Sequence, residues 1–126
     1  MLGTPLDLGK IDTPLYVLAA EADHIAPWTA SYRTTQLVGG PVRFVLSNSG
    51  HIAGIVNPPG NKKAEHWVGT ELPPEPAQWK AEATRHPGSW WVDWLAWAKH
   101  NSGAMVKPPT LPVGAPAPGR YVLDSA

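Results

Sequence analysis

Asp23 and His51 are the two residues whose types and placement best suit chemistry on a substrate. Asp23 comes shortly after the apolar run at residues 15–20, and His51 follows the apolar run at residues 42–46 in a loop of small polar residues. An imidazole works as a general base when a carboxylate fixes its tautomer and stabilises the imidazolium that forms. The pair therefore predicts base assistance to a nucleophile, although a turn aspartate and a solvated histidine would leave the same pattern.

Other catalytic or metal-binding sites built from these residue types have less support in the sequence. His24 is adjacent to Asp23, so in an extended loop its side chain points away from Asp23, and we expect a structural role for it. A metal site built from Asp23, His24 and His51 is not favoured, because no histidine pair has the short spacing typical of metal ligands. The chain has no cysteine, and no serine lies in a G-x-S-x-G motif. We therefore predict neither metal nor cofactor ligands, and no nucleophile is identified.

Two short strands and the helix between them are expected to position the pair. Residues 15–20 and 42–46 are apolar runs bounded by turn formers, which is typical of buried parallel strands. Residues 28–38 read as one helix, with Thr29 as its N-cap and Gly39-Gly40 at its end. Loops that follow neighbouring parallel strands meet at one sheet edge, where open α/β sheets bind ligands. The pattern predicts an α/β fold.

The rest of the chain holds fewer regular elements. Residues 62–72 are expected to contain a short strand or turn around 66–68. Residues 76–85 read as a helix with proline in its first turn, and Ser89 is placed to cap a second helix over residues 90–100.

The helix at 90–100 carries an unusual number of tryptophans. At 100° per residue we place Trp90, Trp94 and Trp97 on one side and Asp93 on the opposite, narrow polar side. Residues 103–126 are rich in Pro, Gly and Ala, which favours an extended tail, and residues 119–123 are predicted to dock as an edge strand.

The bulk composition excludes several classes of protein. Ten Lys and Arg balance ten Asp and Glu, so no net charge attracts nucleic acid, and no apolar run approaches the roughly 20 residues of a transmembrane helix. Fifteen prolines and seven tryptophans in 126 residues leave few long elements and much aromatic surface to cover. Because two strands alone rarely make a stable sheet, we expect a fragment that is incomplete as a domain.

Three longer motifs carry a resemblance to a known family. The sequences EADHIAPW, SGHIAGIVNPP and GSWW resemble, in order and spacing, the C-terminal part of the class I poly(R)-hydroxyalkanoic acid synthases. The resemblance runs from about Asp7 to the closing GRYVLDSA and is far more specific than an Asp/His spacing. It implies that residues 1–102 form the C-terminal segment of an α/β-hydrolase catalytic domain, with its last parallel strands and helices, and that residues 103–126 are a tail.

The same resemblance implies an activity. In this family a cysteine of a Cys-His-Asp triad is acylated by an (R)-3-hydroxyacyl-coenzyme A, and a polyester grows with release of coenzyme A. The coenzyme A thioester is a substrate rather than a cofactor. By motif match, the general base falls on His51 and the aspartate on Asp23. The family also implies cytoplasmic polyester granules as the location, a homodimer on activation, and an upstream part of the catalytic domain as partner.

Two other functions fit the residues. One is the tail of a different α/β-hydrolase, such as an esterase or depolymerase with a serine nucleophile. The other is a fragment without activity that docks on a granule or a partner through its tryptophans. Because the chain lacks a nucleophile, we expect it to be inactive by itself.

Overall fold

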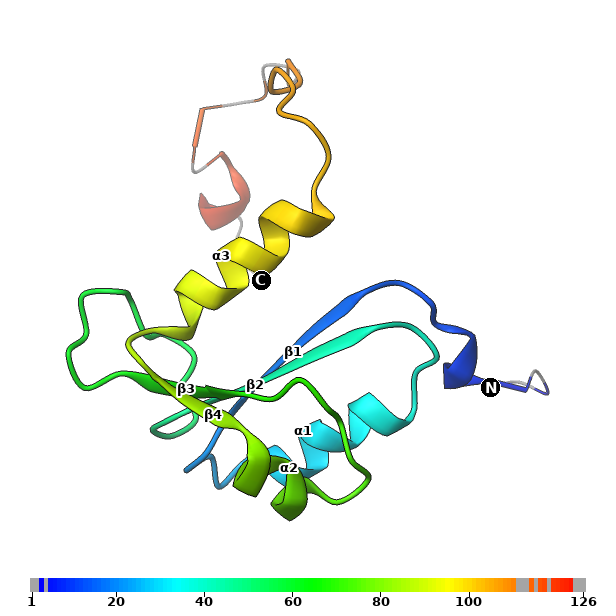
Figure 1. Cartoon of the computed structure of the whole chain (residues 1–126). Helices are drawn as coiled ribbons and strands as arrows, with labels where there is room; N and C mark the ends of the chain where they lie inside the picture. The colour runs from blue at the N-terminus through cyan, green and yellow to red at the C-terminus, as the bar shows by residue number, and fades with distance from the viewer. Residues whose placement is uncertain (1–2, 4, 111–113, 115, 118, 124–126) are drawn as a thin grey trace.

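A four-stranded sheet with helices on both faces organises the chain in the computed structural model (Figure 1). The structure describes residues 3, 5–110, 114, 116–117 and 119–123, so the lead-in and the tail at 103–126 are described only in part. The strands are β1 (Leu15–Ala20), β2 (Val42–Ser47), β3 (Glu65–Val68) and β4 (Thr84–Pro87). The α-helices are α1 (Trp28–Tyr32), α2 (Pro76–Glu82) and α3 (Trp90–Asn101), and 3₁₀ turns span Leu8–Lys10, Arg33–Gln36 and Tyr121–Leu123.

The sheet is mixed, with strand order β1-β2-β3-β4. β1 and β2 are parallel and pair from Leu15 with Val42 to Ala20 with Ser47, whereas β2–β3 and β3–β4 are antiparallel. The two strands predicted from their apolar runs and the strand around residues 66–68 are confirmed. The fold is therefore of the α/β class, and the carboxyl ends of β1 and β2 lie side by side.

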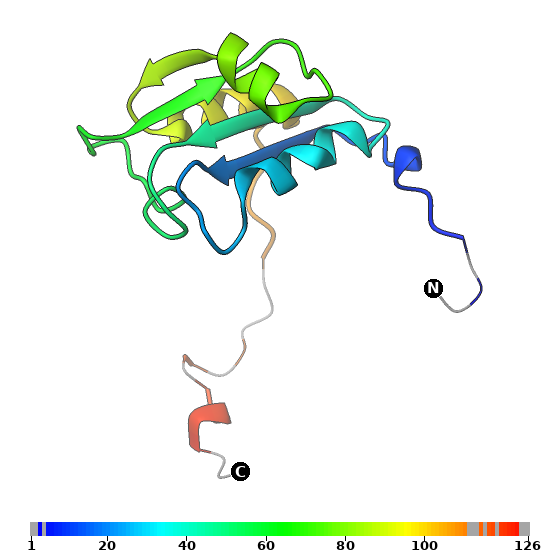
Figure 2. The same cartoon turned by 90° about the horizontal axis from the view of Figure 1, so that it is seen from below.

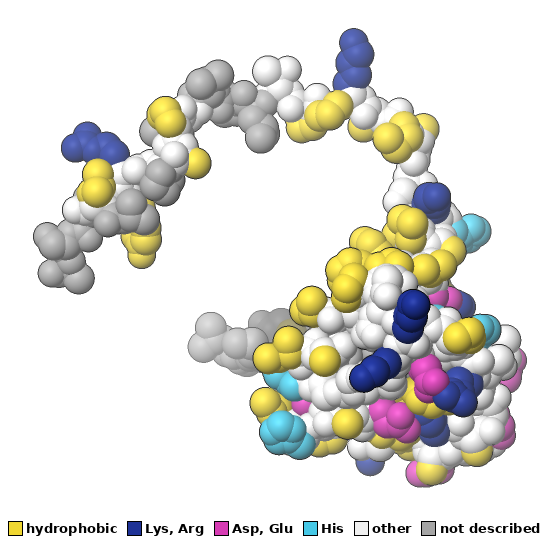
Figure 3. All heavy atoms as spheres, turned by 90° about the vertical axis from the view of Figure 1, so that its left-hand side faces the viewer, with side chains coloured by type: hydrophobic (Ala, Val, Ile, Leu, Met, Phe, Trp, Pro, Cys, Tyr) yellow, Lys and Arg dark blue, Asp and Glu magenta, His cyan; other side chains and the backbone are white. Residues whose placement is uncertain are grey.

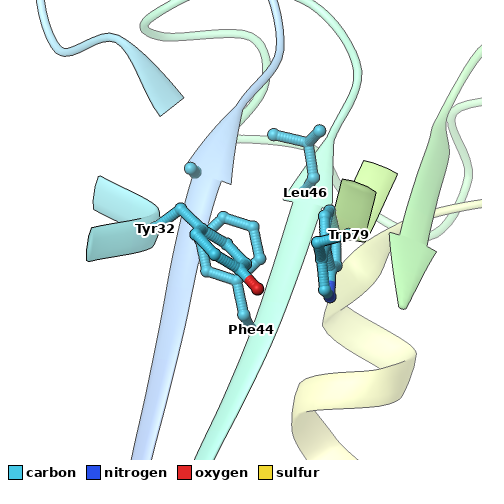
Figure 4. Packing of buried hydrophobic residues seen from close by; sticks show 5 residues of the cluster. Tyr32, Phe44, Leu46 and Trp79 are labelled. Carbon is cyan, nitrogen blue, oxygen red and sulfur yellow. The ribbon is translucent and has the colours of Figure 1, made fainter. Parts of the chain in front are cut away.

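Figure 2, seen from below, shows α1 and α2 on the same face of the sheet. The core lies between these helices and the sheet. Tyr32 from α1, Phe44 and Leu46 from β2, and Trp79 from α2 are buried together (Figure 4). The Phe44 ring meets Tyr32 and Trp79 edge-on, with ring centroids 4.9 Å and 4.7 Å apart. Such edge-to-face pairs stabilise beyond their buried area. This cluster fixes α1 and α2 against β2.

α3 covers the other face of the sheet (Figure 1). A polar network holds it there. Asp93 accepts hydrogen bonds from Tyr16 Oη at 2.9 Å and from Arg43 Nε at 2.8 Å, and it forms an ion pair with Arg43. The Tyr16 ring also packs against Trp90 and Trp97. Burial, and then the neighbouring Asp93 carboxylate, raise the pKa of the Tyr16 hydroxyl, so this group remains a hydrogen-bond donor.

The predicted faces of α3 are partly wrong. Asp93 faces the sheet between Trp90 and Trp97, because it lies three residues after one and four before the other on the same helical side. Trp94 is 45% exposed on the outer side. The N-cap is confirmed, since Ser89 Oγ accepts a hydrogen bond from the Trp91 backbone N–H at 3.0 Å.

The helix predicted over residues 28–38 is shorter than expected. α1 ends at Tyr32, and the chain continues only as a 3₁₀ turn. Thr29 is not the N-cap, because α1 begins at Trp28 and its N-cap residue is Pro27. Gly39 and Gly40 do not cap it. Their backbone N–H groups both donate to the carbonyl of Ile11, and a Cβ at either position would strike the backbone of residues 9 or 12. The two glycines allow this close approach of the chain to itself.

Two further predictions are corrected at the sheet and the tail. The helix predicted over residues 76–85 ends at Glu82, because Ala83 is extended and residues 84–87 add β4 beside β3. Residues 119–123 do not form an edge strand: Tyr121–Leu123 is a 3₁₀ turn with Tyr121 and Leu123 exposed. Local patterns did not reveal β4, because its pairing depends on a partner about 20 residues away.

Candidate functional site

Asp23 and His51 meet where β1 and β2 end. Asp23 is three residues past the end of β1, and His51 is four residues past the end of β2. Beyond the last paired residues, the Glu21 N–H donates to the Ser47 carbonyl at 2.8 Å, and the Ala22 N–H donates to the Ser49 carbonyl at 2.9 Å. The parallel ladder thus extends into the two loops and brings the two side chains to the same sheet edge.

The two side chains form a direct hydrogen bond. His51 Nδ1 lies 2.8 Å from Asp23 Oδ2. The Asp23 side chain is 7% exposed, whereas that of His51 is 48% exposed. The carboxylate is therefore enclosed, and the imidazole faces outward from it.

Backbone amides hold the carboxylate of Asp23 in place. Its Oδ1 accepts hydrogen bonds from the N–H groups of Ile25 and Ala26, each at 2.9 Å. The hydrogen bond from Ala26 and then that from His51 lower the pKa of Asp23 to about 2. A carboxylate that accepts hydrogen bonds in its charged form has this behaviour. Asp23 is consequently an anion at neutral pH.

This geometry sets the tautomer of His51. An ionised carboxylate can only accept, so Nδ1 of His51 carries the proton that it donates to Asp23. Nε2 then keeps its lone pair in the neutral imidazole. A base with a free Nε2 and an anion behind its Nδ1 can take a proton from a thiol or hydroxyl and hold the resulting charge.

The turn around His51 contains features that the sequence patterns did not reveal. Ser49 is the only non-glycine residue with positive φ (72°) among the described residues. The Gly54 N–H donates to the Gly50 carbonyl at 2.8 Å and closes one helical turn that contains His51. The G-x-x-x-G spacing of residues 50–54 is the only sequence signal for this turn.

The competing residues are not brought into this site. His24 is exposed beside Asp23, and within residues 5–110 no hydrogen bond is found for its side chain. The predicted absence of a metal site has no direct test, but no group of three potential ligands is found in the part of the chain that the structure describes.

An apolar groove lies next to the His51 loop. It runs between the loop and α3 and is lined by Ile55, Val56, Trp90, Trp91 and Trp94. Val56 and Trp94 are exposed here at 63% and 45%. Figure 3 shows the hydrophobic side chains gathered where the tail leaves the folded part.

No helix in the described residues is long and apolar enough to cross a membrane.

Comparison with known proteins gives several matches. No family model matches the chain. It is 48% identical over 130 aligned positions to the poly(3-hydroxyalkanoate) polymerase subunit PhaC of Cupriavidus necator, covering 98% of this chain and 22% of that protein. It is 46% identical to poly(3-hydroxyalkanoate) polymerase 2 of Ectopseudomonas oleovorans (96% and 23%) and 39% identical to the PhaC subunit of Rhizobium etli (97% and 20%). The chain spans about a fifth of the length of these relatives.

Proposed function

We propose that this chain, which is similar along nearly its whole length to poly(3-hydroxyalkanoate) polymerases, is the C-terminal part of a class I poly(R)-hydroxyalkanoic acid synthase. Its sheet would be the last part of an α/β-hydrolase fold, and Asp23 and His51 would be two members of a Cys-His-Asp triad. The observation that carries the proposal is the 2.8 Å contact of His51 Nδ1 with Asp23 Oδ2 at the ends of two parallel strands. The cysteine would belong to the rest of the polymerase.

In the first step His51 accepts a proton from the cysteine thiol. The thiolate attacks the thioester carbonyl of an (R)-3-hydroxyacyl-coenzyme A, a new carbon–sulfur bond forms, and the bond to the coenzyme A sulfur breaks. The coenzyme A thiolate that leaves accepts this proton from the His51 imidazolium. Asp23 stays ionised throughout and stabilises that imidazolium, which its low pKa supports.

In the second step a 3-hydroxyl group is the nucleophile. His51 accepts the hydroxyl proton, the oxygen attacks the acyl carbon, an ester bond forms, and the cysteine sulfur leaves as a thiolate that regains the proton. The coenzyme A thioester is thus a substrate and no resident cofactor is needed. Because the His51 side chain is half exposed and its Nδ1 is bonded to Asp23, we expect its Nε2 to accept protons from groups delivered from outside this chain.

The apolar groove beside the site suits the surface of a polyester granule as the place of action. Its lining residues carry no charge, which favours a neutral polyester over the anionic coenzyme A. The same groove favours the second candidate, a fragment that docks on polyester without catalysis. We also propose a dimer of the active polymerase, as in the family.

Substitution of the two histidines tests the proposal. In a polymerase that carries this segment, His51→Gln should abolish release of coenzyme A from 3-hydroxybutyryl-coenzyme A, measured with a thiol reagent. His24→Gln is the matched control and should retain turnover, because His24 is exposed and outside the hydrogen bond. Normal turnover of the His51 variant would remove it from the mechanism. The chain alone should release no coenzyme A, and release by the purified chain would contradict the need for an external nucleophile.

A further inference from the structure

Three consecutive side chains at the start of α3 hold the loop that carries His51. The donors are Ser89 Oγ, Trp90 Nε1 at 3.1 Å and Trp91 Nε1 at 3.2 Å, and the acceptors are, in the same order, the backbone carbonyls of Asn57, Gly54 and Ile55. Loop carbonyls that lose contact with water need such donors. The adjacent serine and tryptophans therefore act together as a clamp on residues 54–57.

Gly54 is the centre of this clamp. Its carbonyl accepts from Trp90 Nε1 and also from Ser47 Oγ at 2.7 Å, so both oxygen lone pairs are used. Its N–H closes the turn that contains His51 through the Gly50 carbonyl. One residue thus connects the end of β2, the start of α3 and the turn of the candidate base.

Close packing leaves Gly54 little freedom to move. It is buried, and a Cβ at this position would overlap the Ala20 side chain at the end of β1 and approach the carbonyls of residues 48 and 50. Ala20 lies three residues before Asp23, so the same contact sets the distance between the two loops. A shift of Gly54 away from β1 would move the His51 turn relative to the carboxylate.

We infer that Trp90 is a positioning residue for His51, acting through its indole N–H on the Gly54 carbonyl. The role in catalysis rests on the proposed function, whereas the role in placing the imidazole on Asp23 does not. Trp91 and Ser89 support the same loop further along. Trp90 is singled out because its acceptor belongs to the residue whose N–H closes the His51 turn.

The test replaces the indole N–H of Trp90 without changing its shape. 3-Benzothienylalanine at position 90 puts sulfur in place of the N–H and keeps the ring against Tyr16. In the 126-residue chain we expect the Gly54 amide to exchange with deuterium about fivefold faster, as expected for the loss of one hydrogen bond. We also expect the NMR signal of the His51 Nδ1 proton to broaden or disappear. The same replacement at Trp94, which has no carbonyl acceptor among the described residues, should leave both signals unchanged.

Unchanged Gly54 exchange and an unchanged His51 signal in a folded Trp90 variant would overturn the inference. If that variant unfolds, a comparison of Trp90→Phe with Trp97→Phe decides, because both rings pack on Tyr16 and, of the two, only Trp90 donates to a described carbonyl. Equal Gly54 exchange in the two variants would overturn the inference, and faster exchange in Trp90→Phe would support it. In a polymerase that carries the segment, we expect kcat to fall about tenfold with KM within twofold, since small misplacements of a catalytic group act on the chemical step. A His51→Gln polymerase that still turns over would refute the proposed function and leave the Gly54 result standing.

Discussion

Asp93→Asn tests whether one polar network fastens α3 to the sheet. The substitution keeps the size of the side chain and removes its charge. Asp93 is 15% exposed and holds Arg43, whose side chain is 38% exposed, together with the Tyr16 hydroxyl. Loss of the charge leaves Arg43 without its counterion in a partly buried position.

The expected cost follows from the hydrogen bonds involved. A hydrogen bond to a charged group contributes about 1.5–3 kcal/mol, and solvent screening at the exposed part of Arg43 reduces this. We therefore expect the free energy of unfolding to fall by about 1–2 kcal/mol at pH 7. The midpoint of thermal unfolding should fall by roughly 4 °C per kcal/mol, where the ranges for smaller and larger domains meet.

The effect should depend on pH in a defined direction. Burial by itself would raise the pKa of Asp93, but the hydrogen bonds from Arg43 and Tyr16 outweigh burial and hold the pKa below its ordinary value of 3.8. A lowered pKa in the folded state contributes stability above the pKa of the unfolded state, and this contribution is lost as the pH falls through the folded value. The difference between the parent chain and Asp93→Asn should therefore shrink below about pH 4.

Urea unfolding followed by circular dichroism from pH 7 to pH 2.5 would measure both effects. A double-mutant cycle with Arg43→Gln isolates the pair, and we expect a coupling energy of about 1 kcal/mol. A loss of stability in Asp93→Asn that persists unchanged at pH 2.5, or a coupling energy near zero, would refute the network as the fastening of α3.

Three other substitutions test the core and the His51 turn. Trp79→Ala should lower the free energy of unfolding by about 3–5 kcal/mol, measured by urea unfolding, because Trp79 is 1% exposed at the centre of the aromatic cluster. Gly54→Ala should cost about 1–3 kcal/mol by overpacking, whereas Gly60→Ala, where a Cβ meets nothing within 4 Å, should not destabilise the chain by this mechanism. Equal losses at the two glycines would contradict the close packing of Gly54. Ser49→Gly should raise the thermal midpoint, since glycine tolerates the positive φ of 72°, and a lower midpoint would show that the serine side chain matters more than the backbone.

The parts of the fold that depend on local patterns were predictable. The apolar runs of β1 and β2 and the serine that caps α3 are local signals, and all are confirmed. So is the closeness of Asp23 and His51, because parallel neighbours bring their following loops together whatever the rest of the sheet does. Their catalytic roles stay a prediction.

The parts that depend on distant partners were not predictable from such patterns. β4 exists because residues 84–87 find an edge of β3, which overrides the helical pattern before them. The side of α3 that carries Asp93 was misassigned even though its spacing of three and four residues from Trp90 and Trp97 puts it on their side; the spacing does not give the partners that Asp93 finds there. Its partners, Arg43 and Tyr16, lie 50 and 77 residues away in the chain. The clamp on Gly54 was likewise not predictable from local patterns, because Trp90 and Gly54 are 36 residues apart in the chain.

The free edge of β1 has a consequence for handling this chain. Among the described residues only β2 pairs with β1, and parallel pairing uses the backbone groups of alternate residues on that side. The backbone N–H and C=O groups of the intervening residues point away from β2. β1 has no charged residue and no internal proline that would hinder pairing with another strand there. At high concentration, the unpaired backbone groups of β1 in two copies of the chain can form hydrogen bonds with each other and join the two sheets. We therefore expect concentrated samples of the chain by itself to aggregate through residues 15–20.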